Sequence, residues 1–363
     1  MNQDKKIEFL RAQEHKPIEW KSILEKCIVH AEKLPLICQS ELDEIKKVIE
    51  TYPLCVNPYY LSLIKDKNDA IYKQCIPSIE ELKDNLQEDP LAEEMTSPVI
   101  GLIHRYPDRV LMTVSNKCAM YCRFCTRKRK VGTERMPMTR ENILKGIAYI
   151  SMHPEIRDVI LSGGDPLMLE DNEIEWILKK LRNIKHVEII RIGTRIPCSL
   201  PQRITPELCS MLRKYHPIYL NTHFNHPDEI TEEAKDACEM LADAGIPLGN
   251  QSVLLKGVND EPDIMKKLVQ KLLTIRVKPY YLYQADMVKG TDYFRTKVER
   301  GIEIIKSLRG WTSGIAVPHY VIDAPSGGGK IPILPEYLKK YKKNGKIILK
   351  NYKNHEHIYL DPY

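Results

Sequence analysis

Three cysteines, Cys118, Cys122 and Cys125, stand in C-x3-C-x2-C spacing on a short segment that follows a β-like run. Three thiolates can hold three irons of a [4Fe–4S] cluster and leave the fourth iron open, whereas an electron-carrier cluster normally has four Cys ligands. A structural zinc site normally closes with four ligands, and the next twenty residues contain no Cys or His. The spacing therefore favours a cluster whose open iron binds a small molecule and passes one electron to it. A redox-sensitive loop, or a zinc knuckle with a distant ligand, is the alternative.

Two glycine-rich segments carry further reactive groups. Residues 162–166, Ser-Gly-Gly-Asp-Pro, follow another β-like run, where glycines let a ligand approach the backbone and the carboxylate can accept from an ammonium. Residues 323–330, Asp-Ala-Pro-Ser-Gly-Gly-Gly-Lys, do not form a Walker A loop, because Ile331 follows the Lys. Lys330 could instead present an amine that forms a Schiff base with a carbonyl. Taken alone, the first segment could be an ordinary turn and the second a surface loop.

Alternating strands and helices must position these groups. Strands are predicted at 110–115, 158–162, 187–193, 218–224, 248–254 and 278–283, and they recur roughly every thirty residues, as in the βα units of a parallel sheet. The candidate residues fall just after strands, and in barrels the C-terminal strand ends build the active site. The sequence therefore predicts an α/β fold, a partial (βα)6 TIM-like barrel whose reactive residues converge on one face.

The chain divides into three predicted regions. Residues 1–104 form a helical N-terminal region with helices at 18–31, 41–51 and 78–86, interrupted by a turn at Asn57-Pro58. Residues 105–325 form the barrel. Its helices have clear boundaries: one begins at Thr205-Pro206, and another begins at Thr231 and ends at Gly245. Residues 326–363 form the lysine arm and a short C-terminal appendage that we expect to pack on the barrel.

The bulk composition narrows the possible partners and the compartment. Of the 363 residues, 43% are hydrophobic and 29% charged, and the net charge is only +6. The charges are interspersed except for the basic run 127–130 beside the cysteines, part of which could bind an anion. We expect no nucleic-acid partner, no membrane association because no stretch of 18 apolar residues exists, and a reducing cytoplasm because seven of the ten cysteines are scattered.

Longer stretches of the sequence resemble the lysine 2,3-aminomutase family, whose members are radical S-adenosylmethionine (SAM) enzymes that also use pyridoxal 5'-phosphate (PLP). The resemblance includes Asn-Pro-Tyr-Tyr-Leu-Ser-Leu-Ile at 57–64, His-Arg-Tyr-Pro-Asp-Arg-Val-Leu at 104–111 and the cysteine segment 118–127. It continues through Leu-Lys-Gly-Val-Asn-Asp at 255–260, Pro-Tyr-Tyr-Leu-Tyr at 279–283 and the lysine arm 323–330. It covers most of the chain.

The resemblance implies a role for each matching residue. Cys118, Cys122 and Cys125 hold the [4Fe–4S] cluster, and SAM contacts Gly163, Gly164, Asp165 and His223. Lys330 is the catalytic lysine that bonds to PLP, and the other PLP contacts are Arg105, Tyr106, Arg109, Gln251, Tyr280 and Tyr283. Two arginines suit the phosphate dianion because the guanidinium fork pairs with its oxygens. For the tyrosines and arginines, core packing or an ordinary ion pair is the alternative.

Three further residues indicate the substrate. The resemblance assigns Arg127 to the substrate carboxylate and the carboxylates of Asp286 and Asp323 to the distal ammonium. Two carboxylates in a partly buried pocket require a cationic partner, because unpaired buried charge is costly. The predicted reaction moves the 2-amino group of L-lysine to C3 and gives β-lysine, which makes the protein an isomerase. An aminomutase of arginine or ornithine, or an enzyme that makes β-lysine for modification of a translation factor, is the alternative.

The sequence also departs from the family pattern. Longer members carry a Cys-rich tail that binds zinc together with a neighbouring subunit, but no Cys follows Cys238, and the position of the neighbour's ligand is Glu261. We therefore expect no structural zinc and a homo-oligomer without zinc bridging. The remaining expected partners are the amino acid substrate and a one-electron reductant of the flavodoxin or ferredoxin type.

Overall fold

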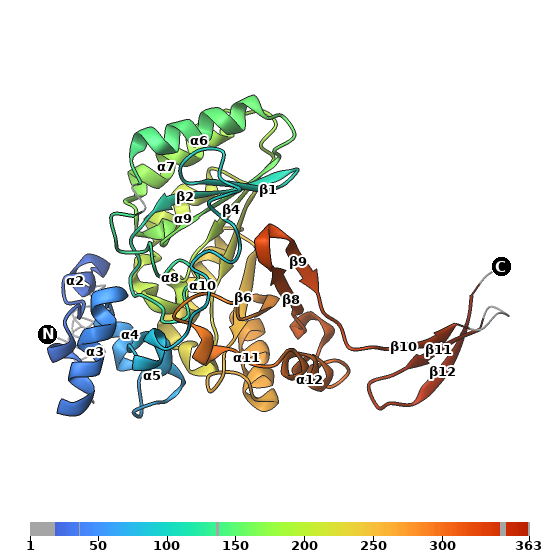
Figure 1. The fold of residues 1–363 in the computed structure, drawn as a ribbon. Helices are drawn as coiled ribbons and strands as arrows, with labels where there is room; N and C mark the ends of the chain where they lie inside the picture. Colours follow the sequence, from blue (N-terminus) through green and yellow to red (C-terminus); the bar gives the residue numbers. More distant parts are fainter. Residues whose placement is uncertain (1–18, 36, 136–137, 342–345, 362–363) are drawn as a thin grey trace, which may run out of the picture.

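A nine-stranded sheet curls into a nearly closed barrel at the centre of the molecule (Figure 1). The computed structural model describes residues 19–35, 37–135, 138–341 and 346–361. The strands follow one another around the sheet in chain order, and β2 to β8 are parallel. They are β1 (Leu102–Tyr106), β2 (Arg109–Ser115), β3 (Asp158–Gly163), β4 (Ile189–Gly193), β5 (Ile218–Thr222), β6 (Leu248–Leu254), β7 (Lys278–Gln284), β8 (His319–Ala324) and β9 (Gly329–Pro332).

The predicted partial (βα)6 barrel is confirmed, with one strand more than the sequence indicated. The six predicted strands correspond to β2 to β7. A seventh parallel strand, β8, pairs with β7 and so lengthens the curled sheet. Its pattern was hard to recognise, because His319 is exposed and Asp323 is only partly buried, so apolar residues do not alternate cleanly along it. Asp323 therefore belongs to the barrel wall, next to the lysine arm.

Six helices follow the strands β2 to β7 and cover the outside of the barrel (Figure 1). In α11, Met265, Leu268 and Leu272 recur at helical spacing, and each side chain is fully buried. The predicted starts at Thr205 and Thr231 are confirmed, since both side chains accept backbone N–H bonds as N-caps. The six helices are α6 (Arg140–Met152), α7 (Asp171–Arg182), α9 (Pro206–Arg213), α10 (Glu232–Asp243), α11 (Pro262–Thr274) and α12 (Val298–Leu308).

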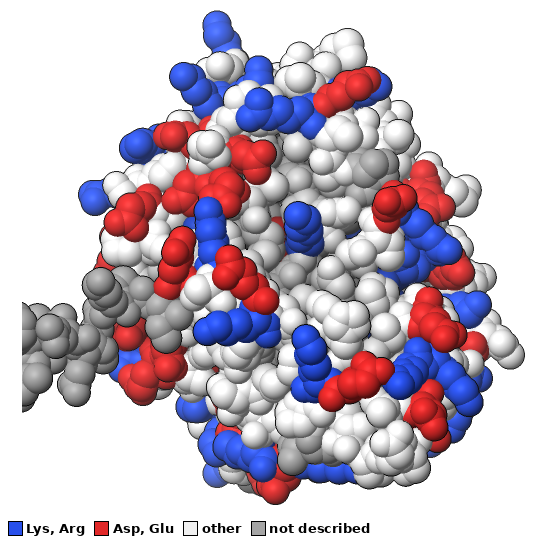
Figure 2. Space-filling model, turned by 90° about the vertical axis from the view of Figure 1, so that its left-hand side faces the viewer, with Lys and Arg blue, Asp and Glu red and all other residues white. Residues whose placement is uncertain are grey.

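Among the described residues, no helix is long and apolar enough to cross a membrane. Shorter helical segments complete the fold. Within the barrel these segments are α8 (Ile196–Ser199), η3 (Pro166–Met168), η4 (Pro201–Arg203), η5 (Pro227–Glu229), η6 (Asp292–Phe294), η7 (Gly314–Ala316) and η8 (Pro325–Gly327). On the face shown in Figure 2, basic and acidic side chains are interspersed, as the charge pattern of the sequence indicated.

The N-terminal region is helical, but its helices are shorter than predicted. The predicted helix 18–31 is reduced to α2 (Trp20–Leu24) and η1 (Ala31–Lys33), because the chain between them forms a β-bridge from Ile28 to Val56. The part of that prediction before residue 19 lies outside the described residues. The helices are interrupted before Asn57, as predicted, and Asn57 itself caps α4 by accepting from the Tyr60 N–H at 2.9 Å. The remaining segments are α3 (Gln39–Thr51), α4 (Pro58–Ser62), α5 (Ala70–Cys75) and η2 (Ile79–Leu82).

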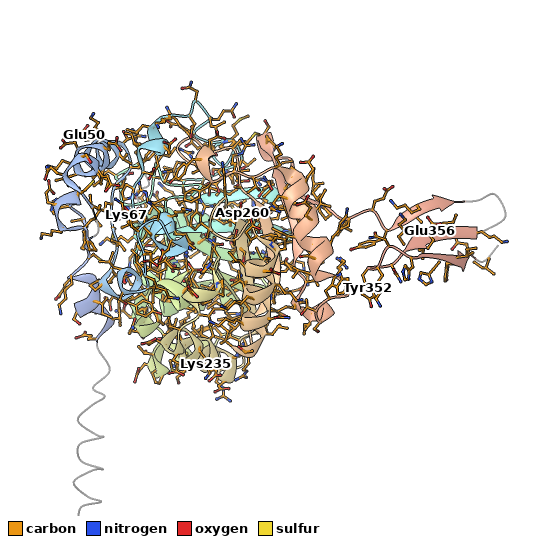
Figure 3. All side chains as sticks on the ribbon, turned by 90° about the horizontal axis from the view of Figure 1, so that it is seen from below. Glu50, Lys67, Lys235, Asp260, Tyr352 and Glu356 are labelled. Carbon is orange, nitrogen blue, oxygen red and sulfur yellow. The ribbon has the colours of Figure 1, made fainter. Side chains whose placement is uncertain are left out.

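The C-terminal segment does not lie along the barrel, which differs from our expectation. Strands β10 (Leu338–Tyr341), β11 (Lys346–Lys350) and β12 (Glu356–Leu360) pair with one another in a separate antiparallel sheet. This sheet projects from the body, with Tyr352 at the near side (Figures 1 and 3). There the rings of Tyr352 and Trp311 meet edge to face, 5.1 Å apart. Strand pairing within the segment is thus combined with a limited contact to the body of the molecule at Tyr352.

Candidate active site

The cysteine loop follows β2 and is hydrogen-bonded to the N-terminal helical region. The backbone N–H of Tyr121 donates to the Cys55 carbonyl at 2.8 Å, and that of Arg123 donates to the Gln74 carbonyl at 2.9 Å. The Arg123 guanidinium forms a bidentate pair with Glu81, and both side chains are almost completely buried. The N-terminal region therefore anchors the loop through backbone and charge contacts.

The surroundings of the three sulfurs suit thiolate ligands of a metal cluster. Burial raises the pKa of Cys118 well above its ordinary value and that of Cys125 to about 11, so a positively charged metal centre would be needed to deprotonate them. The Arg195 guanidinium donates to Cys122 Sγ at 2.7 Å, and the Arg127 N–H donates to Cys125 Sγ at 3.4 Å. Among the described residues, no three His, Cys, Asp or Glu side chains converge on a single metal ion. Cys118, Cys122 and Cys125 line one cavity, and this all-sulfur donor set fits an iron–sulfur cluster.

Arg195 is a residue of this site that the sequence did not reveal. Its Nη2 atom donates to Glu229 and Gln74, each at 2.7 Å, and to the Tyr60 hydroxyl at 3.1 Å. The network is buried and fixes the guanidinium against Cys122. The available signal was position: Arg195 lies two residues beyond the end of β4, where other candidates follow their strands.

Gly163 and Gly164 allow the loop after β3 to stack against the cysteine loop. Gly163 has φ +131°, and a Cβ there would lie 2.2 Å from the Ser115 carbonyl oxygen. A Cβ on Gly164 would lie 2.4 Å from the Lys117 carbonyl oxygen. The Gly164 N–H donates to the Ser115 carbonyl at 2.6 Å. The glycines thus allow close packing of this loop on the segment that leads into the cysteines.

Asp165 and His223, the other two candidate SAM contacts, differ in how many hydrogen bonds their side chains already make. Asp165 already accepts from Thr194 Oγ1 and the Arg195 N–H, both at 2.7 Å, and from the Leu167 N–H at 3.0 Å. Burial raises its pKa to about 6 despite these bonds. This carboxylate therefore holds the loop in place. The His223 ring lies 5.5 Å from the Phe124 ring, and burial together with the Arg195 charge lowers its pKa to about 3, so it is neutral.

Lys330 lies on β9, which pairs with β8 so that Lys330 and Asp323 are opposite each other. The Lys330 ammonium contacts Asp323 Oδ2 at 3.1 Å and lies 5.7 Å from the Tyr283 ring centroid. The Lys330 N–H donates to the Tyr106 hydroxyl at 2.9 Å. The predicted Lys330, Asp323, Tyr106 and Tyr283 are therefore neighbours, and the amine is held on a paired strand.

Two arginines beside this lysine have capacity for an anion. Arg105 donates to Asp323 Oδ1 at 2.9 Å and to the Leu91 carbonyl at 2.6 Å, while its buried Nε has no hydrogen-bond partner among the described residues. The Arg109 guanidinium lies 3.9 Å from the Tyr106 ring centroid and pairs with Asp108. An orphaned cationic donor and a stacked guanidinium fit the phosphate of PLP.

Tyrosines of β7 form an aromatic wall next to the arginines. The register between β6 and β7 shifts after Asn250, so that Gln251 pairs with Tyr281. This shift brings Tyr280 and Tyr281 together, with rings 3.9 Å and hydroxyls 3.1 Å apart. Tyr281 also contacts the Tyr283 ring at 5.3 Å. The sequence predicts Tyr280 and Tyr283 but not Tyr281, because a β-bulge cannot be recognised from alternation alone.

The residues predicted to bind the two ends of the substrate are acidic at one end and basic at the other. Asp286, just after β7, has its pKa raised to about 7, first by burial and then by the charge of Asp323. Arg127 forms a bidentate pair with Glu93, which the sequence did not single out, and its Nη1 lies 3.3 Å from Ser162 Oγ. Glu93 also adds to the raised pKa of Asp286, so the two ends share one electrostatic environment.

Known proteins match the chain over most of its length. The profile of the radical SAM superfamily matches residues 112–269, and the profile described as Lysine-2,3-aminomutase matches residues 305–363. The L-lysine 2,3-aminomutase of Methanococcus maripaludis is 55% identical over 329 residues, which are 89% of this chain and 76% of that protein. The L-lysine 2,3-aminomutase of Clostridium subterminale is 54% identical over 333 residues, 91% of this chain and 80% of that protein.

A relative with a different substrate is nearly as similar. The glutamate 2,3-aminomutase of Clostridioides difficile is 50% identical over 309 residues, which are 84% of this chain and 73% of that protein. Overall identity therefore separates the two amino acids poorly, and the side chains at the substrate ends must decide between them.

Proposed function

This chain belongs to the lysine 2,3-aminomutase family of radical SAM enzymes, and from that premise we propose that it moves the 2-amino group of L-lysine to C3, giving β-lysine. The pair of carboxylates Asp286 and Asp323 carries the choice of substrate. Asp323 contacts Lys330, and the charge of Asp323 helps to raise the pKa of Asp286 after burial, whereas the charge of Lys330 lowers it. A distal ammonium would satisfy this pair, whereas the side-chain carboxylate of glutamate would be repelled.

The cofactors are a [4Fe–4S] cluster, SAM and PLP, and their chemistry is the one-electron cleavage of SAM to a radical that abstracts hydrogen, with PLP carrying the migrating nitrogen. The protein residues bind and orient. We assign Cys118, Cys122 and Cys125 to the cluster, with Gly163 and Gly164 offering backbone to SAM beside it. Asp165 keeps that backbone in place, and His223 provides a neutral wall.

On the PLP side, we assign Lys330 to the covalent attachment and Arg105 and Arg109 to the phosphate. Tyr106, Gln251, Tyr280 and Tyr283, together with Tyr281, enclose the ring and exclude water. Arg127 binds the α-carboxylate of lysine, so that the substrate is fixed at both ends. Fixing both ends holds the reacting carbon in one place, which is the main contribution a protein can make to such a reaction.

Arginine and ornithine are less favoured substrates, because neither matches a relative reported above. Modification of a translation factor is not favoured for the same reason. We propose that the enzyme works in the cytoplasm with a flavodoxin- or ferredoxin-type reductant, since its ten cysteines are all free thiols. We further propose a homo-oligomer without zinc bridging. Exposed apolar residues on β12, such as Ile358 and Leu360, support association, and Glu261 is paired with Arg300.

The test uses anaerobic, cluster-reconstituted protein with PLP, SAM and dithionite. Lysine, ornithine, arginine and glutamate are supplied separately, and α- and β-amino acids are separated by chromatography. We expect β-lysine alone. Turnover of arginine, ornithine or glutamate would refute the substrate assignment, and SAM cleavage without any isomer would refute the aminomutase reaction. Lys330→Ala should lose both the product and the PLP absorbance band of the attached cofactor.

A further inference from the structure

One segment outside the barrel contacts the lysine arm, β1 and Arg127. Residues 89–97, here called the strap, lie between the N-terminal region and β1. The Pro90 carbonyl accepts from the Ser326 N–H at 2.8 Å, which ties the strap to the lysine arm. The Leu91 carbonyl accepts from Arg105 Nη2 at 2.6 Å, and the Thr96 carbonyl accepts from the His104 N–H at 2.9 Å. Near its start, the strap is therefore hydrogen-bonded to the lysine arm, and at two points it is hydrogen-bonded to β1.

Glu93 of the strap meets Arg127 through one edge of the guanidinium. Nε donates to Glu93 Oε2 at 2.9 Å, and Nη2 donates to Oε1. The side chains are 16% and 13% exposed, so the pair is largely shielded from water. The remaining nitrogen, Nη1, makes only long contacts, 3.3 Å to Ser162 Oγ and 3.5 Å to the Gly163 carbonyl. The edge formed by Nη1 and the second Nη2 hydrogen is therefore available for another carboxylate.

We propose that Glu93 is a positioning residue that clamps Arg127 by its Nε–Nη2 edge, so that the opposite edge is presented to the α-carboxylate of the substrate. The inference rests on the proposed function, because it deepens the role of Arg127. A guanidinium can use both edges at once, since it has five donors in a fixed plane. An arginine without Glu93 would keep its charge but lose its fixed orientation.

The charges around Glu93 keep it ionised for this task. Burial alone would raise its pKa, but the charge of Arg127 and the hydrogen bonds from it outweigh burial and lower the pKa. Lys130 and Arg105 act in the same direction. Because both Glu93 oxygens are engaged by Arg127 and cations surround the pair, the substrate carboxylate need not displace Glu93 to bind.

The experiment compares L-lysine with L-lysinamide, which lacks the carboxylate charge. Binding to PLP-loaded protein without SAM or reductant is followed by the cofactor absorbance and by calorimetry, so that turnover is not the readout. The variant is Glu93→Gln. The matched control is Glu94→Gln, a neighbouring strap carboxylate that is 61% exposed and pairs with Lys130.

We expect Glu93→Gln to weaken lysine binding about tenfold, the effect of one misplaced charge-assisted hydrogen bond, and to leave lysinamide binding unchanged. Glu94→Gln should change neither. In the double variant Glu93→Gln/Arg127→Gln no buried cation is left unpaired, and its lysine-to-lysinamide ratio should equal that of Arg127→Gln alone.

Three results with Glu93→Gln would overturn the role of Glu93. Lysine affinity could be unchanged, or lysine could bind more tightly, which would make Glu93 a competitor of the substrate carboxylate. Equal losses of affinity for lysine and lysinamide would make its role merely structural. A wild-type protein that does not respond to lysine at all would instead refute the proposed function. The two failures are therefore distinguishable.

Discussion

Replacing Asp286 by Asn should change both the pH dependence of lysine binding and the stability of the empty enzyme. The pKa of Asp286 is raised from 3.8 to about 7 by burial and by the charge of Asp323. Ionising this carboxyl in the empty site therefore costs about 4 kcal/mol more than in water. A cationic ligand must offset that cost, which makes Asp286 selective for an ammonium.

The sign of both effects follows from a raised carboxyl pKa. Below about pH 7 the empty site holds the neutral acid, so lysine affinity should fall about tenfold per pH unit below the pKa and level off above it. This fall in affinity below the pKa forms the acid limb of the pH profile. In the Asn variant the limb should disappear, and discrimination between lysine and norleucine should shrink.

Stability should change in the opposite sense. The folded state loses stability as pH rises from the ordinary pKa to the raised one, because the unfolded chain ionises more easily. The ligand-free Asn variant should therefore melt at a higher temperature than wild type at pH 8, with an upper limit of about 4 kcal/mol, and at the same temperature near pH 4.

The assay is lysine affinity between pH 6 and 9 from the cofactor absorbance, with thermal melts of the ligand-free protein. Asp292→Asn is the control, because Asp292 lies nearby on η6, is 48% exposed and pairs with Arg295. Lysine affinity that is flat across this range in wild type, or an unchanged limb in the Asn variant, would refute the assignment of Asp286 to the ammonium.

Three other substitutions test the cluster side. Glu81→Gln would leave the buried cations Arg123 and Lys128, which both pair with Glu81, uncompensated. It should lower the free energy of unfolding by about 3–5 kcal/mol in chemical denaturation, whereas the exposed Glu80→Gln should have little effect. Equal stability of the two variants would contradict this reasoning. Gly164→Ala places a Cβ 2.4 Å from a backbone oxygen of the cysteine loop and should reduce the iron and sulfide content, while Gly314→Ala, with nothing within 4 Å, should not. Arg195→Gln removes a cationic hydrogen bond to a cluster sulfur and should make the cluster potential more negative, on the order of tens of millivolts, in an EPR-monitored titration; a rise would count against the contact.

The sequence was most informative where chemistry depends on local spacing. The cysteine motif, the glycine pair and Lys330 were recognisable because each lies in a short segment, and the six strands were recognisable from their regular spacing. Strand β8 was missed because polar residues facing the site, among them Asp323, interrupt its apolar alternation.

The partners of these residues could not be predicted, since they depend on segments far apart in the chain. Glu93 and Arg127 are 34 residues apart in the chain, and Glu229 and Arg195 are separated by the same number. Nothing local marks either carboxylate as the ligand of a particular arginine. Tyr281 was missed because the bulge in β7 sets its direction.

The attachment of Lys330 to the last strands of the sheet has a consequence for the order in which the enzyme matures. The cysteine loop and its supporting helices precede residue 135, whereas β8 and β9 are synthesised nearly two hundred residues later. A nascent chain can therefore present its iron-binding thiols long before it can retain PLP. If Lys330 holds PLP as proposed, the cysteine loop is complete well before the residue that binds this cofactor has been added to the chain.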